Sequence, residues 1–249
     1  MNTADAALGP LTMDYLERVA PVELERYRLR VAGVAYEEKG ILYSEMFFLY
    51  LCARAAGARR ILESGRARGQ STLLLSACFP DRAVISLEHD ERSPDVAIAA
   101  DRLAGRANVE LRFGDATQIL PRITQPGDVV LIDGPKGYRG LRLALRLLAQ
   151  GRASLVFLHD IDRRSPERRL VEARLPDTLY SDDPRFARLA QALDAPARDT
   201  IPVERRWGDA GAPGGYGYTL ACLQRTPNAG FRMAWLASVL DGVLRRGAG

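Results

Sequence analysis

Acidic side chains and a histidine recur along the middle of the chain, each at or directly after the end of a short apolar run. These residues are Glu63, Glu88, Asp115, Asp133 and the pair His159-Asp160. A carboxylate can accept hydrogen bonds from hydroxyl groups or hold a cation, and a histidine can bind a metal or move a proton. We therefore expect one polar site, provided that the fold brings the ends of these runs together.

The segment VVLIDGPKGYRG places a lysine, Lys136, three residues after Asp133. Lys136 and Lys39 are the only lysines in the chain, which otherwise uses arginine for its positive charge. Arginine stays protonated near neutral pH, whereas a partly desolvated lysine can give up its proton. The lysine at this position indicates a chemical need for a group that can lose its proton, and the alternative is a lysine that lies over the edge of a sheet.

Short apolar runs alternate with amphipathic stretches between residues 60 and 158. We expect strands at 60–63, 83–88, 109–113, 128–132 and 154–158, and helices near 70–79, 93–104, 116–121 and 139–150. Apolar strands separated by helices are typical of a parallel sheet covered on both faces. The predicted fold class is therefore α/β and Rossmann-like. In such sheets ligands bind at the carboxyl ends of the strands, where the strand order reverses.

The flanking segments complete the predicted chain organisation. We expect a helical extension at 1–57, with a helix at 11–37 interrupted near Pro21 and a helix at 44–56 with Ser44 as N-cap and Gly57 past its end. Ser165, followed by proline, predicts another helix start. An antiparallel pair formed by 200–203 and 216–223 should lie at the sheet edge, and 230–245 should form the closing helix. Residues 58–249 are then a single globular unit.

The segment ILESGRARGQST follows the first predicted strand. A dinucleotide-binding turn, G-x-G-x-x-G, needs three glycines, and only the first of the corresponding positions, Gly65, holds one. The pattern E-x-G-x-G-x-G fits better, with Glu63, Gly65 and Gly69 in place and Ala67 at the centre. A loop of this second kind wraps a ligand without a pyrophosphate, such as S-adenosylmethionine (SAM).

Over about residues 41–160, and more weakly to residue 223, the chain resembles the class I SAM-dependent methyltransferases. The run ILYSEMFFLYLCARAAGARRILESGRARGQSTLLLS is similar to the opening of the catechol and caffeoyl-CoA O-methyltransferase branch, whose loop ends in Gly-x-Ser-Thr. The resemblance implies SAM as the cofactor. It implies that the methionine part is held by Glu63, Gly65, Gly69 and Ser71, the ribose by Glu88, and the adenine by His89, Asp115 and Ala116, with Asp133 also in the set.

The metal-dependent branch of that family has an aspartate after the fourth strand, a lysine three residues later, a tyrosine two beyond it, and Asp-Asn after the fifth strand. The chain has Asp133, Lys136, Tyr138 one position early, and His159-Asp160. The resemblance implies a metal site of Asp133, His159 and Asp160, with Lys136 as the base. Two carboxylates suit Mg²⁺, whereas His159 favours Mn²⁺ or Zn²⁺ or is itself the base. The sequence leaves these choices open.

Bulk composition restricts the expected partners. The chain has 249 residues, a net charge of +4 and 47% hydrophobic residues, which is ordinary for a soluble globular protein. Acids are interspersed among the arginines, so the charge does not predict nucleic-acid binding. The N-terminus does not look like a signal peptide, and 41–58 is too short and too charged to span a membrane. Cys52, Cys78 and Cys222 match neither zinc nor disulfide spacing, so we expect reduced, buried thiols in a cytoplasmic protein.

The expected function is O-methylation of a small-molecule hydroxyl, on a phenol, a sugar or a natural product, with 162–214 forming much of the acceptor pocket. One alternative is a catalytically silent SAM-binding partner protein. Another is an NAD(P)-dependent oxidoreductase, which the poor glycine match disfavours. Arg66 and Arg68 could contact a SAM carboxylate or an anionic substrate, but we favour solvated surface arginines. Apolar faces on the N-terminal helices predict a homodimer.

Overall fold

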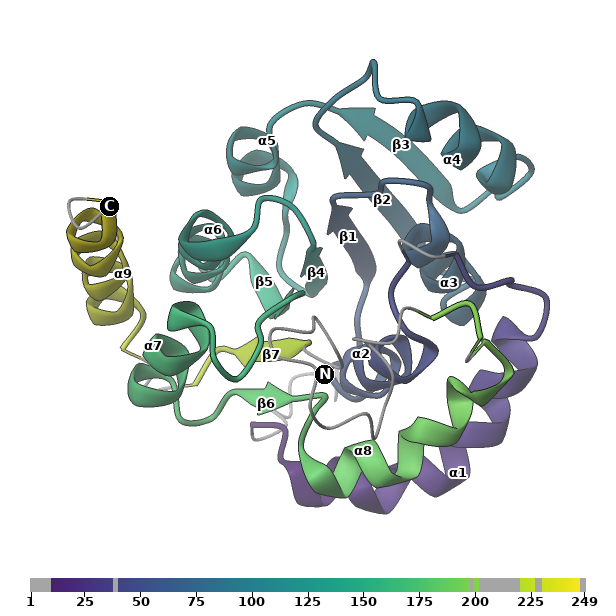
Figure 1. Cartoon of the computed structure of the whole chain (residues 1–249), viewed down its shortest axis with the longest axis horizontal. Helices are drawn as coiled ribbons and strands as arrows, with labels where there is room; N and C mark the ends of the chain where they lie inside the picture. The colour runs from purple at the N-terminus through teal and green to yellow at the C-terminus, as the bar shows by residue number, and fades with distance from the viewer. Residues whose placement is uncertain (1–9, 38–39, 198, 202–219, 227–229, 247–249) are drawn as a thin grey trace, which may run out of the picture.

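A computed structural model describes residues 10–37, 40–197, 199–201, 220–226 and 230–246 (Figure 1). Within these residues seven strands form one sheet in the order β3-β2-β1-β4-β5-β7-β6. The strands are β1 (Arg60–Ser64), β2 (Ala83–Glu88), β3 (Val109–Phe113), β4 (Asp128–Ile132), β5 (Ala153–Leu158), β6 (Leu179–Tyr180) and β7 (Ala221–Gln224). Each of the five strands predicted between residues 60 and 158 is present, with bounds that differ by at most one residue.

The sheet is parallel from β3 to β5, and β1 pairs with both β2 and β4. The order therefore reverses between β1 and β4, which is where an open α/β sheet binds its ligand. The antiparallel strand near the C-terminus is β7, which pairs with β5 on one side and with the short β6 on the other. The predicted α/β fold class is confirmed. Of the predicted antiparallel pair, 202–203 and 216–219 lie outside the described residues. The described Thr200 and Ile201 lie in a turn, so the prediction that they pair with the last strand is wrong, and β6 takes that place at the sheet edge.

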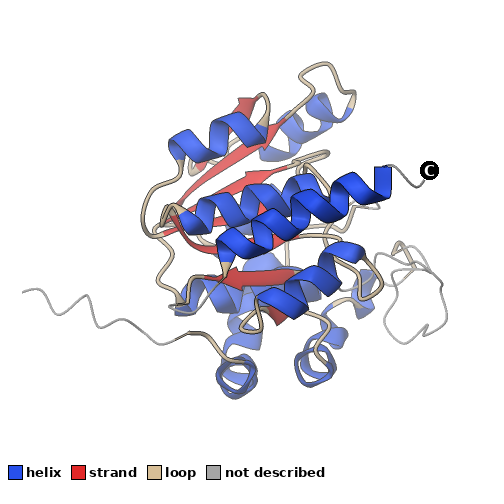
Figure 2. Ribbon diagram, turned by 90° about the vertical axis from the view of Figure 1, so that its left-hand side faces the viewer, coloured by secondary structure: helices blue, strands red, loops and turns tan. Residues whose placement is uncertain are grey.

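Helices cover both faces of the sheet (Figure 1). The core on one face joins α1 (Met13–Val31), α2 (Tyr43–Ala55), α3 (Gln70–Cys78) and α8 (Pro184–Ala190) to the strands. The other core joins α5 (Ala116–Ile123), α6 (Gly137–Ala149), α7 (Pro166–Arg174) and α9 (Phe231–Arg246). The helix α4 (Asp95–Leu103) packs beside α3, and two 3₁₀ helices, Gln191–Leu193 and Ala195–Ala197, follow α8. Figure 2, seen from the side of α9, shows this helix in front of the strands.

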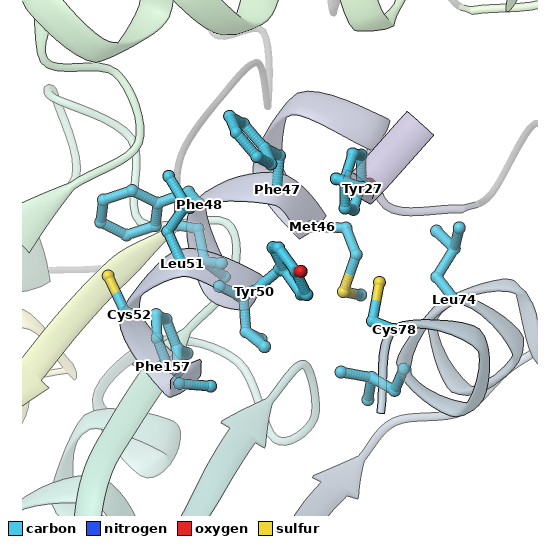
Figure 3. Packing of buried hydrophobic residues seen from close by; sticks show 14 of the residues in the cluster. Tyr27, Met46, Phe47, Phe48, Tyr50, Leu51, Cys52, Leu74, Cys78 and Phe157 are labelled. Atoms are coloured by element: carbon cyan, nitrogen blue, oxygen red, sulfur yellow. The ribbon is translucent and has the colours of Figure 1, made fainter. Parts of the chain in front are cut away.

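Alternate side chains of each central strand enter the two cores. In β1, Ile61 faces the first core and Leu62 the second, which explains why the run is apolar without interruption. The helix α2 is buried almost all round, and its Phe48 meets Phe157 of β5 edge-on, with 6.1 Å between ring centroids (Figure 3). Because α2 shares its core with the sheet, it can place a side chain close to the strand ends. The boundary at residue 57 stays a prediction.

The described helices match the expected ones with three corrections. The helix α1 ends at Val31 rather than at residue 37, with Gly33 in the turn that follows it. The helix α1 continues through Pro21, because packing of Leu16, Ala20 and Tyr27 outweighs the one hydrogen bond that a proline removes. Ser44 is not an N-cap: α2 begins at Tyr43, and the carboxylate of Asp194 accepts from the Ser44 N–H at 3.1 Å.

Two other expected helix signals are confirmed, and so is the state of the cysteines. Gly57 lies just past α2 with a φ of 62°, and Ser165 caps α7 by accepting from the Arg168 N–H. The three cysteines are free and buried, as expected. In the described part of the chain, none of the helices has both the length and the apolarity needed to cross a membrane.

Candidate active site

The loops that follow β1 and β4 touch each other at the carboxyl edge of the sheet. The backbone N–H groups of Asp133 and Gly134 both donate to the carbonyl of Ser64, at 2.8 and 3.0 Å. Gly65 has a φ of 89°, and a Cβ on it would lie 2.7 Å from the Gly134 nitrogen. Only glycine fits this contact, since a side chain would collide with rigid backbone. The two loops therefore meet, as the predicted strand order requires.

Asp133, His159 and Asp160 come together at the ends of β4 and β5. One potential ligand atom from each lies within 4.8 Å of the others. The Nδ1 atom of His159 is 2.6 Å from Asp133 Oδ1 and 3.5 Å from Asp160 Oδ1. The backbone of Asp160 is left-handed, with a φ of 57°, a conformation in which aspartate is over-represented among non-glycine residues. The donor set of two carboxylates and one imidazole fits a divalent cation.

Lys136 contacts two of these side chains, the carboxylates of Asp133 and Asp160. It precedes α6, and its Nζ donates to Asp133 and, at 2.5 Å, to Asp160 Oδ2. Desolvation favours the neutral amine, but the charges of Asp133 and Asp160 outweigh it and raise the Lys136 pKa above its ordinary value. The expected lowering of this pKa is wrong, because two carboxylates rather than one face the ammonium group.

His159 is enclosed between carboxylates on both edges of its ring. Its side chain is 6% exposed, and its Nε2 lies 3.3 Å from Glu45 Oε2 of α2. Burial lowers the pKa of His159, but Asp133, Asp160 and Glu45 together raise it to about 10. Burial likewise opposes ionisation of Asp133, yet His159 and Lys136 hold the pKa of Asp133 well below its usual range. In this arrangement both His159 and Lys136 carry protons, so neither is a ready base.

Sequence reasoning missed Glu45. Its carboxylate is fully buried and also accepts from the backbone N–H of Leu42 at 2.9 Å. In the sequence, Glu45 stood out only as a charge that interrupts an apolar stretch. That was the available signal, since a carboxylate on a helix buried all round must have a charged or hydrogen-bonding partner. Its partner His159 is 114 residues away and could not be read from spacing.

Glu63, the first residue of the predicted cofactor loop, points into the space between β1, β2 and α3. Its Oε2 accepts from Ser86 Oγ at 2.6 Å and from Thr72 Oγ1. Burial raises the Glu63 pKa, and the neighbouring hydroxyls oppose that rise. Within the described residues its other oxygen, Oε1, is buried without a hydrogen-bond partner. A buried acceptor of this kind could be satisfied by a donor from outside the chain.

Glu88, the last residue of β2, accepts hydrogen bonds from the loop after β1 and from its own neighbour. Its Oε2 accepts from the Ala67 N–H at 2.9 Å and its Oε1 from the His89 N–H at 2.7 Å. Each carboxylate oxygen has a second lone pair, so Glu88 could still accept from two ligand hydroxyls. Gly69, with a φ of 80°, is the N-cap residue of α3, and Ser71 is buried in the first turn of this helix.

Asp115 and its neighbours lie at the end of β3. Asp115 caps α5 by accepting from the Thr117 N–H at 2.8 Å, and Arg139 Nη2 lies 2.8 Å from its other oxygen. The Thr117 hydrogen bonds, followed by the Arg139 charge, lower the Asp115 pKa. Ala116 is buried and His89 is exposed. These contacts give Asp115 a structural role, and the predicted adenine contacts of the three residues stay predictions.

The loop arginines differ from the expectation of solvated surface groups. Arg66 is 2% exposed, donates to the Ser86 carbonyl at 2.9 Å and lies over the Phe113 ring, so its interpretation as a solvated residue is wrong. Arg68 is paired with Glu37 and Asp95. The physical reason is that the segment before α2 and the helix α4 pack against this loop. Tyr138 donates to Asp241 of α9, away from the acid cluster.

A narrow pocket joins the loop to the acid cluster. It is lined by Glu37, Gly40 and Ile41 from the segment before α2, by residues 65–68, 70 and 71, and by Asp133. Gln70 Nε2 donates to the Ile41 carbonyl at 2.9 Å and holds that segment over the loop. The pocket therefore connects the predicted cofactor-binding loop to Asp133.

Comparison with known proteins agrees with this geometry. Residues 62–161, which run from β1 to just past the His159-Asp160 pair, match a family described as a methyltransferase domain. The middle of the chain is thus similar to a methyltransferase domain. The resemblance to class I SAM-dependent methyltransferases is thereby confirmed at the level of this domain.

Two curated relatives are similar over the same region. A protein from Niastella koreensis named catechol O-methyltransferase is 35% identical over 95 residues, covering 36% of this chain and 43% of that protein. One of the same name from Mycobacterium tuberculosis is 36% identical over 114 residues, covering 44% and 52%. The methyltransferase domain and its flanks thus span about half the length of the curated relatives they match. Among solved structures, an O-methyltransferase from Streptomyces achromogenes in complex with SAM is 22% identical, with 82% of this chain and 89% of that chain covered and a TM-score of 0.45.

Proposed function

We propose that the protein is a SAM-dependent O-methyltransferase that acts on the hydroxyl group of a small molecule. The observation that carries the proposal is the direct contact between the glycine loop after β1 and the Asp133–Gly134 turn after β4. A methyl donor held by the first loop would face an acceptor held at the second. The names of the two curated relatives support hydroxyl chemistry.

The chain offers a partner for each part of SAM. The orphaned Oε1 of Glu63 suits the methionine end, whose ammonium group is a donor. Glu88 has lone pairs left for the ribose hydroxyls, and His89, Asp115 and Ala116 lie at the neighbouring strand ends for the adenine. When bound, SAM supplies an electrophilic methyl group on a positively charged sulfur.

The work of the chain is alignment and proton removal. Holding two reactants at near-attack distance can supply up to about 7–11 kcal/mol of the barrier. Removal of the hydroxyl proton by a positioned base adds about 10²–10⁴-fold. We assign that role to Lys136, which can take a proton only after its contacts with Asp133 and Asp160 are broken. His159 is the less suited base because carboxylates hold its ring on both sides.

The acid cluster supports a metal-assisted form of this reaction. Asp133, Asp160 and His159 Nδ1 would hold a divalent cation once Nδ1 has lost its proton, and the cation would supply Lewis acidity that lowers the pKa of an acceptor hydroxyl. Glu45 keeps the His159 ring oriented from its other edge, as is common for metal-bound histidines.

The test is methyl transfer from SAM labelled in its methyl group. We expect labelled product with catechol or another member of a panel of phenols and sugars, and loss of product with the Asp133→Asn and Asp160→Asn variants. Binding of SAM without transfer to any acceptor would instead favour the silent partner protein. Binding of NAD in place of SAM would favour the oxidoreductase.

The cellular setting and the assembly extend the same proposal. Three free, buried thiols support a reducing compartment such as the cytoplasm. Val22 and Leu29 of α1 are 66% and 78% exposed, and they support a homodimer through the N-terminal helices. Light scattering after size-exclusion chromatography would give the mass, and a monomer at all concentrations would contradict the dimer.

A further inference from the structure

Lys136 occupies the position between two carboxylates where the proposed metal would be bound. Its Nζ donates to Asp133 and to Asp160 Oδ2, and these are two of the three side chains that could hold a cation. The ammonium group is thus already a cation in the site. We propose that the Lys136 ammonium and a divalent cation are alternative occupants of the Asp133–Asp160 pair, so that a metal binds only when Lys136 leaves. This inference rests on the metal site of the proposed function.

The charges around the pair support exclusion. The carboxylates of Asp133, Asp160 and Glu45 face the ammonium of Lys136 and the ring of His159, so the cluster is nearly balanced without a metal. A divalent cation that joined this cluster would lie within a few ångströms of the ammonium group. Repulsion between like charges at that range is strong wherever the surroundings are drier than bulk water. One of the two cations therefore has to give way.

The exposure of the side chains indicates which group can move. The Lys136 side chain is 50% exposed, so it can turn into solvent without opening the core. The His159 side chain is 6% exposed, and its Nε2 atom contacts Glu45, which is itself fully buried. Lysine also has a long, flexible stem that rotates at low cost. Lys136 is thus the exchangeable group, and the histidine and both aspartates form the fixed frame.

Exchange gives a second reason, besides general-base chemistry, for a lysine at position 136 of an arginine-rich chain. A guanidinium group would bind two carboxylates with several parallel hydrogen bonds and would be displaced less easily. A single ammonium group offsets part of the negative charge of the two aspartates and is displaced from them more easily. The affinity for the metal is then set by Lys136 as well as by the metal ligands.

Manganese binding to the SAM-free protein tests the exchange. The free Mn²⁺ signal in electron paramagnetic resonance gives the affinity for wild type, Lys136→Met, Lys136→Arg and Arg139→Met. Lys136→Met removes the competing charge and should bind Mn²⁺ at least about tenfold more tightly. Lys136→Arg should bind no more tightly than wild type. Arg139→Met removes a charge one turn away that is paired with Asp115 instead, and it should stay within about twofold of wild type.

Equal or weaker Mn²⁺ binding by Lys136→Met would overturn the proposal, as would the absence of binding in every variant. The wild-type chain gives a second readout that does not depend on a folded mutant. Acetylation of Lys136, followed by mass spectrometry with Lys39 as the internal reference, should be faster when Mn²⁺ is present. Unchanged or slower acetylation would also contradict exchange. Both readouts are independent of methyl transfer, so failure of the enzymatic function and failure of the exchange are distinguishable.

Discussion

At the scale of single residues, Lys136 and its neighbours determine what the site can do. The ammonium group faces two carboxylates, and the imidazole of His159 lies between Asp133 and Glu45. Lys136 was recognisable from the sequence because lysine is scarce and its spacing to Asp133 is short. Glu45 and Arg66 were not, because the contacts that give them meaning join side chains far apart along the chain.

The Lys136→Arg variant tests the base at this scale. Arginine keeps the charge and approximate length but cannot accept a proton, so kcat should fall by at least about a hundredfold while SAM affinity stays nearly unchanged. Steady-state kinetics with labelled SAM and calorimetry would measure the two quantities. The exposed Arg146→Lys variant, a conservative change near the end of α6 and outside both the cluster and residues 162–214, should keep wild-type turnover. Near-normal turnover in Lys136→Arg would remove Lys136 from the base role.

At the scale of elements, the turn after β5 is held by α7 and β6. Arg168 of α7 is buried, donates to the Ile161 carbonyl at 3.4 Å, pairs with Asp182 at 3.1 Å and stacks on the Tyr180 ring at 3.5 Å. Ile161 directly follows Asp160, whose backbone is left-handed. These contacts hold the backbone that directly follows Asp160.

Removal of this contact should be costly. Arg168→Met should lower the free energy of unfolding by about 3 kcal/mol. This value is at the low end for a broken buried ion pair, because Asp182 keeps its ion pair with Arg163. Urea unfolding would measure the change. The exposed neighbour Arg169→Met should shift stability by no more than about 0.5 kcal/mol. Similar stabilities for the two variants would show that the turn does not depend on Arg168.

Elements were predictable to different degrees for physical reasons. The strands and the helices α3 to α7 follow from local patterning, because buried parallel strands are apolar throughout and amphipathic helices lie between them. The course of α1 through Pro21 and the start of α2 before Ser44 depend on tertiary contacts, the latter on Asp194. Such contacts override local start and stop signals, and β6 was too short to give a signal.

At the scale of the whole molecule, buried acids make stability depend on pH. Burial raises the pKa of Asp194 to about 6, opposed by its hydrogen bonds to Ser44 and reinforced by Glu45. The folded state then binds this proton more tightly than the unfolded state does. Its stabilising contribution is complete below about pH 4, where the unfolded carboxyl is also protonated, and is lost as the pH rises through about 6.

The expected loss from Asp194 is of the order of 2–3 kcal/mol between pH 4 and pH 7. Asp194→Asn keeps an oxygen acceptor for the Ser44 N–H but cannot ionise, so its stability relative to wild type should rise across this range. Urea unfolding of both proteins at several pH values would measure it. Asp115 and Asp133, whose pKa values are lowered, titrate below this window with the opposite sign. A constant difference between wild type and Asp194→Asn would contradict a protonated Asp194 in the folded protein.

The central claim is that SAM binds at the crevice between β1 and β4 with its ribose on Glu88. Calorimetric titration of SAM into wild type, Glu88→Gln and Glu91→Gln tests this binding mode most directly. Glu91 serves as the control because it is an exposed acid on the loop that follows Glu88. We expect wild type and Glu91→Gln to bind SAM equally. Glu88→Gln should bind SAM about 10- to 150-fold more weakly. This range corresponds to about 1.5–3 kcal/mol, the contribution of a hydrogen bond to a charged group. Wild-type protein that does not bind SAM, or a folded Glu88→Gln variant with wild-type affinity, would contradict it.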